Sequence, residues 1–255
     1  MSGHSKWATI KHKKGAVDKA RGKLFAKLIR QVEVAAREGG GDPDTNPTLR
    51  TMFQKARESS VPIDTIDRAI KRGTGELEGV HYEQISYEGY APSGVAMIVE
   101  CLTDNRNRSG SDIRSTFSKN GGSLAEPGAV AWQFNRKGVV LVAKVKAGGE
   151  QISEDDLMLV ALDHGAEDIT EAGDSWQVTT PPNEVEAVRA ALDDAGFPIE
   201  SAEATLLADN LVPLDNEVDA KKVLHLIDLL EEYDDVQNVY ANFDIPDSII
   251  ELIKA

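Results

Sequence analysis

The clearest chemistry in this sequence is the binding of anions by a cationic N-terminal stretch. Residues 1–30 contain nine Lys and Arg against a single acid, Asp18. A spaced row of cations neutralises successive phosphates of a nucleic acid while reading little of its base sequence, and Trp7 could stack on an unpaired base. The predicted nucleic-acid contacts are Lys6, Trp7, Lys11, His12, Lys13, Lys14, Arg21, Lys23, Lys27 and Arg30. The alternative is a solvated helix face preceded by a basic arm.

The charge of the chain is strongly partitioned, which favours the nucleic-acid interpretation. Residues 1–80 carry 16 Lys and Arg against 10 Asp and Glu, whereas residues 81–255 carry 12 against 33. The formal net charge is therefore +6 in the first part and -21 in the second, and -15 for the 255-residue chain. This asymmetry predicts a polyanion-binding face on one part and a body that repels polyanions, with protein contacts through the acidic part.

A second candidate phosphate site is the segment TDNRNRSGSDIR, which lies where a strand is expected to end and a helix to begin. Free backbone N–H groups at a helix N-terminus and nearby arginines can converge on one phosphate. The candidates are Asn105, Arg106, Asn107, Arg108 and Arg114. In the alternative interpretation, Asn105 and Ser109 are turn and capping residues, and the arginines pair with Asp104 and Asp112.

Residue patterns typical of enzymes are sparse. The five histidines are scattered, and neither a CxxC pair nor a His/Cys spacing typical of a metal site occurs. The sequence has no P-loop and no GxGxxG. Cys101 is expected as a small buried hydrophobe of a central strand, and the acids Glu231, Glu232, Asp234 and Asp235 as a solvated acidic face. We therefore expect no enzyme activity, catalytic residue, metal, cofactor or small-molecule substrate.

The composition is that of a globular protein without a membrane segment. Hydrophobic residues make up 41% and charged residues 28% of the chain, and no stretch approaches the ~20 apolar residues of a membrane span. The basic N-terminus lacks a following apolar run of the kind found in export signals. With Cys101 as the single cysteine, no internal disulfide can form. We expect a cytoplasmic protein that does not contact a membrane.

The first 78 residues are predicted to form a basic domain of three helices. Between residues 16 and 37, apolar residues fall on one arc of a helical wheel, and the cations lie almost opposite, facing solvent. The apolar set is Leu24, Phe25, Leu28, Ile29, Val32, Ala35 and Ala36, and the cations are Lys19, Lys23, Lys27, Arg30 and Arg37. Glycines 39–41 end this helix. Asn46 caps the second helix with Pro47 at its first position, and Asp64 caps the third.

The remaining sequence predicts an α+β arrangement of two ferredoxin-like α/β domains, one inserted in the other. Residues 136–205 read as βαββαβ, the ferredoxin-like order. Two further runs each contain only half of this order: a β-α-β run over 94–134 and a strand-helix-strand run over about 205–243. Joining them gives a discontinuous domain of 79–135 plus 206–246, with 247–255 as a tail. Strand 83–90 is expected to extend the outer sheet through a hairpin at 91–94.

Several separated motifs resemble the YebC/PmpR family, which includes the mitochondrial translational activator of cytochrome c oxidase. They are GHSKWATIKHKKG, RGKLFAKLIR, VAAREGGGDPDTNPTLR, DTIDRAIKRGTGE, YEGYAPSGVAMIVECLTDNRNR and KNGGSLAEPGAVAWQF, in family order across essentially the whole chain. The sequence departs at VDKARGK, where the family order is Asp-Ala-Lys-Arg-Gly-Lys. This moves Lys19 one place, about 100°, around the helix.

The resemblance implies a three-domain, non-enzymatic protein with a helical N-terminal domain and two α/β domains. Bacterial members are described as DNA-binding transcriptional regulators, and other members as ribosome-associated translation factors that help elongation through stretches such as consecutive prolines. A phosphate-binding arm serves both roles. Lysines suit phosphates better than base edges, so the residues favour ribosomal RNA, with DNA as the alternative.

Overall fold

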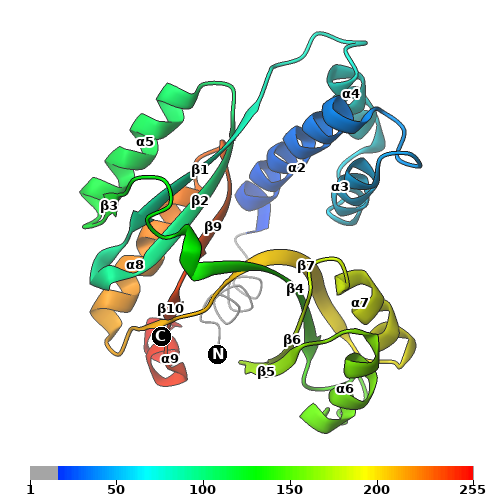
Figure 1. Ribbon diagram of the computed structural model, residues 1–255, viewed down its shortest axis with the longest axis vertical. Coiled ribbons are helices and arrows are strands. Elements are labelled where there is room, and N and C mark those ends of the chain that lie inside the picture. The colour runs from blue at the N-terminus through cyan, green and yellow to red at the C-terminus, as the bar shows by residue number, and fades with distance from the viewer. Residues whose placement is uncertain (1–16, 255) are drawn as a thin grey trace.

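The computed structural model describes residues 17–254, with side chains for 22–246 and 248–253. Within these residues, three helices precede two four-stranded antiparallel sheets with helices packed on them, and this arrangement confirms the predicted α+β fold (Figure 1). In the described part, no helix combines the length and apolar composition needed to cross a bilayer.

The N-terminal helices are α2 (Val17–Gly39), α3 (Pro47–Glu58) and α4 (Ile63–Gly73). Their shared core includes Val32, Leu49 and Ile66, all fully buried, but Leu24, predicted on the buried face, is 45% exposed. Asn46 caps α3 as predicted, because its Oδ1 accepts the N–H of Leu49 at 3.0 Å. The predicted Asp64 cap is wrong: α4 begins two residues earlier than that cap implies, and its N-cap position is Pro62, which has no side-chain hydrogen bond.

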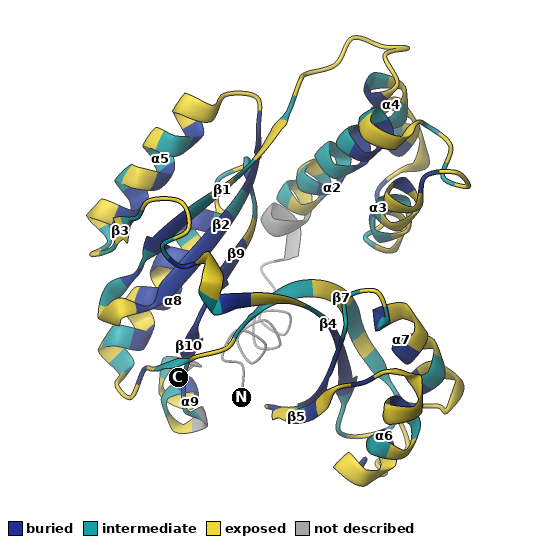
Figure 2. Ribbon diagram, viewed as in Figure 1, coloured by how far each residue is buried: buried dark blue, intermediate teal, exposed yellow. Residues whose placement is uncertain are grey.

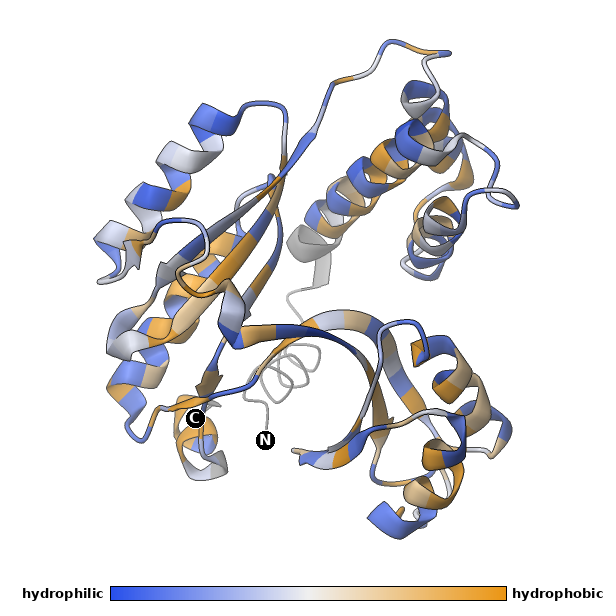
Figure 3. Cartoon of the chain, viewed as in Figure 1, coloured by the Kyte–Doolittle hydropathy of each residue, from blue (hydrophilic) through white to orange (hydrophobic). Residues whose placement is uncertain are grey.

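The outer sheet has the order β3-β1-β2-β9, with all neighbours antiparallel. Its strands are β1 (Glu83–Tyr90), β2 (Ala96–Thr103), β3 (Ser123–Leu124) and β9 (Val236–Ala241). Helices α5 (Arg106–Lys119) and α8 (Glu217–Glu231) cover one face, as Figure 1 shows. The exposed positions of α5 lie away from the sheet (Figure 2), and apolar residues gather in β2 and α8 (Figure 3). The sheet core therefore lies between the strands and these two helices.

One prediction for the outer sheet is confirmed and another is wrong. Strand β1 extends the sheet beyond β2 through the predicted hairpin, in continuous register from Glu83 opposite Thr103 to Tyr90 opposite Ala96, and the two-residue β3 pairs with its other side. The strand predicted over 128–134 is wrong. The carboxylate of Glu88 accepts the N–H groups of Gly128, Val130 and Ala131 at 2.6–2.8 Å, so these groups bind a side chain and not a neighbouring strand.

The inner sheet has the order β5-β6-β4-β7 and the βαββαβ connectivity. Its elements are β4 (Phe134–Ala143), α6 (Glu154–Ala161), β5 (Asp168–Ala172), β6 (Ser175–Thr180), α7 (Val185–Asp194) and β7 (Ile199–Ala208). Strand β7 pairs with β4 as far as Ala208 opposite Phe134, so residues 205–208 do not form the outer strand that the sequence predicted. All of 134–208 lies in the chain between β3 and α8, as an insertion.

Short elements complete the fold. Strand β8 (Val212–Pro213) pairs in parallel with β10 (Phe243–Asp244). Among the described residues, 3₁₀ turns lie at Pro92–Gly94, Ala131–Gln133 and Leu162–His164. The segment predicted as a tail contains the helix α9 (Asp247–Lys254), and Ile250 of this helix is buried in the outer core.

Candidate nucleic-acid interface

The described cations of the first predicted site lie on one side of α2. Lys23, Lys27 and Arg30 follow a spacing of four and three residues, which places them on a single helix face. The prediction that this face points to solvent is wrong. Lys23 Nζ donates to the carbonyl oxygen of Glu232 at 2.9 Å, and Lys27 Nζ donates to that of Glu231 at 3.4 Å. These cations therefore contact the C-terminal end of α8.

A helix C-terminus attracts cations because its last carbonyl groups have no intrahelical partner and carry partial negative charge. Helix α8 ends at Glu231, with Glu232 at its C-cap. The cationic face of α2 thus satisfies carbonyl groups that would otherwise bind water. The attraction between these cations and the carbonyl groups therefore favours the packing of α2 against the C-terminal end of α8.

Arg30, the third cation of this set, makes several contacts with other parts of the chain. Its Nη1 donates to the carbonyl oxygen of Asp234 at 2.8 Å and to Oδ1 of Asp235 at 2.9 Å. The guanidinium carbon lies 5.5 Å from the ring centroid of Tyr82, within the range of a cation–π interaction. Arg30 therefore joins α2 to the turn between α8 and β9, and to the residue just before β1.

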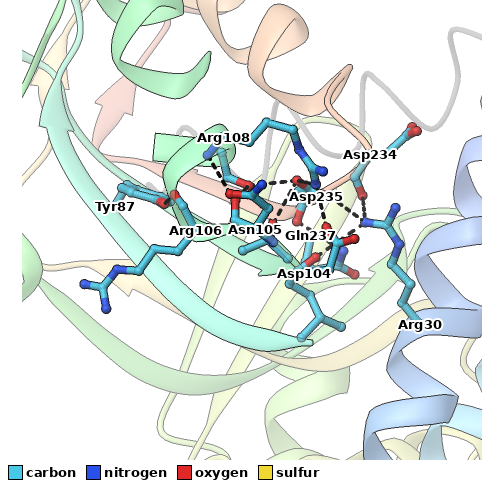
Figure 4. A network of polar contacts seen from close by, with 12 residues as sticks. Arg30, Tyr87, Asp104, Asn105, Arg106, Arg108, Asp234, Asp235 and Gln237 are labelled. Atoms are coloured by element: carbon cyan, nitrogen blue, oxygen red, sulfur yellow. Dashed lines mark hydrogen bonds and ion pairs between the residues drawn. The ribbon is translucent and has the colours of Figure 1, made fainter. Parts of the chain in front are cut away.

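The second carboxylate oxygen of Asp235 contacts the second candidate phosphate site, at the start of α5 (Figure 4). Its Oδ2 accepts from Arg108 Nη2 at 2.7 Å, from Ser109 Oγ at 2.8 Å and from Thr103 Oγ1 at 3.0 Å. With Arg30 on Oδ1, one carboxylate has four donors from three segments of the chain. The two predicted cationic sites thus converge on Asp235.

The carboxylate of Asp235 is poorly solvated yet ionised. Its side chain is 13% exposed. Burial raises the pKa of this carboxyl group, but hydrogen bonds from Arg108, Ser109, Thr103 and Arg30 outweigh burial and hold the pKa below its ordinary value. The contacts of Arg108 with Asp235 and Asp104 in turn raise the pKa of its guanidinium.

The remaining residues of the second site have separate positions at the start of α5. Asn105 caps this helix, since its Oδ1 accepts the N–H of Arg108 at 3.1 Å, and Arg108 also pairs with Asp104 at 2.7 Å. Both contacts belong to the capping and pairing alternative. Arg106, Asn107 and Arg114 are exposed, and the side chain of Arg106 points away from Asp235 (Figure 4). The structure therefore brings only Arg108 of this set to the cations of α2.

The rest of the first set lies outside the described residues. This applies to Lys6, Trp7, Lys11, His12, Lys13 and Lys14, and to the side chain of Arg21.

Sequence reasoning missed the partner that connects the two sites. Asp235 was assigned to a solvated acidic face, but its side chain is mostly buried. Thr103 and Ser109 are also buried, and their hydroxyl oxygens lie 2.7 Å apart. The available signal for a buried anion was the pair of hydroxyl residues, Thr103 and Ser109, at the two ends of the TDNRNRS segment. The anion itself, Asp235, lies more than 120 residues further along the chain.

Other chemistry-bearing groups are dispersed in the described part of the chain. Residues 17–254 contain no group of three or more His, Cys, Asp or Glu side chains positioned to hold a metal ion. Cys101 is fully buried, and burial is the main factor that raises the pKa of its thiol to about 12. This thiol is therefore protonated and inaccessible at neutral pH.

Comparison with known proteins places the chain among relatives of similar length. The chain is 56% identical to a "Probable transcriptional regulatory protein" of Salinispora arenicola over 98% of both chains, and 56% identical to one of Thermobifida fusca over the full length of both. The crystal structure of a conserved hypothetical protein from Aquifex aeolicus superimposes with a TM-score of 0.81. That protein is 46% identical, and the match covers 94% of this chain and 97% of that one.

Two family models cover most of the sequence. The model described as the TACO1/YebC protein N-terminal domain matches residues 5–76, and the model described as the TACO1/YebC second and third domain matches residues 82–243. Both predicted cationic sites fall within these matches. The chain therefore belongs to the TACO1/YebC family.

Proposed function

We propose that this protein is a non-enzymatic regulator of gene expression that binds the phosphate backbone of a nucleic acid through its cationic N-terminal domain. The observation that carries the proposal is the convergence of Lys23, Lys27 and Arg30 with Arg108 around one carboxylate and one helix end. In this conformation the four cations bind carboxylate and carbonyl oxygens, and phosphate oxygens accept hydrogen bonds from the same kinds of donor. The partition of charge in the sequence supports the same proposal.

Ribosomal RNA is the first candidate target, and the protein would act as a ribosome-associated translation factor. Two of the three described cations of the first predicted site are lysines, which bind phosphate as point charges and carry little base specificity. A strongly acidic body discourages indiscriminate binding to nucleic acid. Its acidic surface is also available for contacts with basic proteins.

DNA is the second candidate, and the names of the relatives favour it. Proteins 56% identical to this chain are called probable transcriptional regulatory proteins. In this version, the same cations contact the DNA backbone, and sequence preference comes from other groups or from the shape of the DNA.

Sedimentation of a cell extract through sucrose gradients at low and high salt tests the first candidate. We expect the protein to travel with ribosomal subunits or ribosomes at low salt and to leave them at high salt, because phosphate contacts weaken as counterions compete. A protein that stays at the top of the gradient at low salt contradicts the translation role.

Binding to a promoter fragment and to a scrambled duplex of equal length, at near-physiological salt, tests the second candidate. A transcriptional regulator binds the promoter more tightly, and equal affinities contradict that role.

A further inference from the structure

We propose that Asp235 competes internally with nucleic acid for the cations of α2, so that the N-terminal domain binds phosphates after it has left its contact with α8 and β9. This inference rests on the proposed function and adds a regulatory step to it. In the described conformation, Lys23, Lys27 and Arg30 already have anionic or carbonyl partners on the outer domain. A phosphate group must displace these partners or meet the cations elsewhere.

The surroundings of Asp235 resemble those of a bound oxyanion. Two guanidinium groups and two hydroxyl groups donate to its two oxygens at 2.7–3.0 Å. Phosphate oxygens accept from the same kinds of donor, with similar lengths. The carboxylate therefore occupies the position that a phosphate would need in order to bind Arg30 and Arg108 together.

The contact between the N-terminal helices and the rest of the chain is polar. The described core of α2, α3 and α4 is a separate hydrophobic cluster, and the outer sheet has its own. The described links between these parts include Gln31 Nε2 to Gln237 Oε1 at 3.2 Å, and, toward the inner sheet, an exposed ion pair of Lys55 with Glu203 at 3.5 Å. Polar contacts of this kind favour relative domain motion and weaken with salt.

The chain has one short place at which such a motion can occur. Residues 74–82 contain neither helix nor strand. Their first part is held to the N-terminal helices, because Leu77 N donates to the carbonyl oxygen of Lys71 at 3.1 Å and Arg37 Nη1 donates to that of Val80 at 2.9 Å. Strand β1 begins at Glu83. The hinge is therefore restricted to residues 81–82, next to the ring that Arg30 covers.

The test compares Asp235→Asn with Asp104→Asn in the full chain. Both variants remove one negative charge that pairs with Arg108, but only the first also removes the partner of Arg30. Fluorophores on Thr48→Cys and Ser118→Cys, both at exposed positions, report the distance between α3 and α5 by energy transfer. The native Cys101 is buried and does not compete for the label.

We expect Asp235→Asn to lower the energy transfer and to bind a fluorescein-labelled single-stranded uridine oligonucleotide about fivefold more tightly, because more molecules are open at any moment. Asp104→Asn should stay within about twofold of the parent in affinity, without a change in energy transfer. Adding the oligonucleotide to the parent should lower energy transfer in the same direction, since coupling between binding and opening is reciprocal.

Gln237→Ala provides a second, uncharged variant if Asp235→Asn does not fold, as judged by circular dichroism. It removes a contact between α2 and β9 without touching a cation or a carboxylate, and we expect a smaller shift in the same direction. The proposed competition is overturned if Asp235→Asn and Asp104→Asn show equal affinity and equal energy transfer. If Asp235→Asn does not fold, it is overturned when Gln237→Ala keeps the affinity and energy transfer of the parent. If no variant binds either the oligonucleotide or a DNA duplex, the proposed function itself is contradicted. If energy transfer falls in Asp235→Asn while no nucleic acid binds, the domain motion is present and the nucleic-acid-binding role fails, so the two failures can be distinguished.

Discussion

Arg30 of α2 donates to Asp235, 205 residues further along the chain, at 2.9 Å. This contact joins a helix of the N-terminal domain to the turn that precedes β9, and it gives the carboxylate one of its four donors. The acid limb of the stability profile should therefore depend on Asp235. Its pKa is lowered in the folded chain, so its stabilising contribution is present above the unfolded pKa and is lost as pH falls through the folded value.

We expect the free energy of unfolding of the parent to fall more steeply than that of Asp235→Asn below about pH 5. Urea unfolding of both chains at a series of pH values measures the difference. Asp104→Asn is the matched control and should keep the steep acid limb of the parent. Parallel acid limbs for the parent and Asp235→Asn would show that this carboxylate is not held by its donors.

Gly73 lies where α4 packs tightly against α2. A Cβ there would overlap the carbonyl oxygen of Glu33 and lie 2.8 Å from the Cβ of Ala36. We expect Gly73→Ala to destabilise the N-terminal domain by about 1–3 kcal/mol through overpacking. Hydrogen exchange of the α2 and α4 amides in the full chain measures the change.

Gly22 is the control for this substitution. It lies within α2, and a Cβ there meets nothing within 4 Å. Gly22→Ala should leave exchange unchanged or slow it, by up to about 1 kcal/mol in helix propensity. Similar effects of the two substitutions would show that the α2–α4 contact is looser than described.

Glu88 holds the loop before β4. Burial raises the pKa of its carboxyl group, but the three backbone N–H donors outweigh burial and lower it. Glu88→Ala leaves these donors without their acceptor, which costs about 1–3 kcal/mol. We expect faster exchange of the amides of residues 128–131, whereas Glu126→Gln, at an exposed position in the same loop, should exchange like the parent. Unchanged exchange in Glu88→Ala would mean that other groups fix the loop.

The parts of the fold that were predictable from sequence depend on local signals. Asn46 and Pro47 predicted the start of α3, and the mostly apolar run of residues 94–104 predicted β2, which is buried at nearly every position. The strand expected over 128–134 has a similar apolar pattern, but its N–H groups bind Glu88, some 40 residues earlier. Likewise, the wheel of α2 separated its cations from its core, but only the fold reveals that the cations meet α8 and Asp235. Contacts between groups so distant in sequence leave no periodic pattern to detect.

The salt dependence of RNA binding tests the central claim most directly. The change is Lys11, Lys13, Lys14 and Lys23 to Ala together, against a control with Lys119, Lys144, Lys146 and Lys221 to Ala, which removes the same charge from the other domains. Each lost phosphate contact should reduce the slope of log affinity against log salt by about 0.7 for a single strand. We predict a reduction of about 2 to 3 for the N-terminal variant and the parent slope for the control. An unchanged slope in the N-terminal variant would place the nucleic-acid site elsewhere.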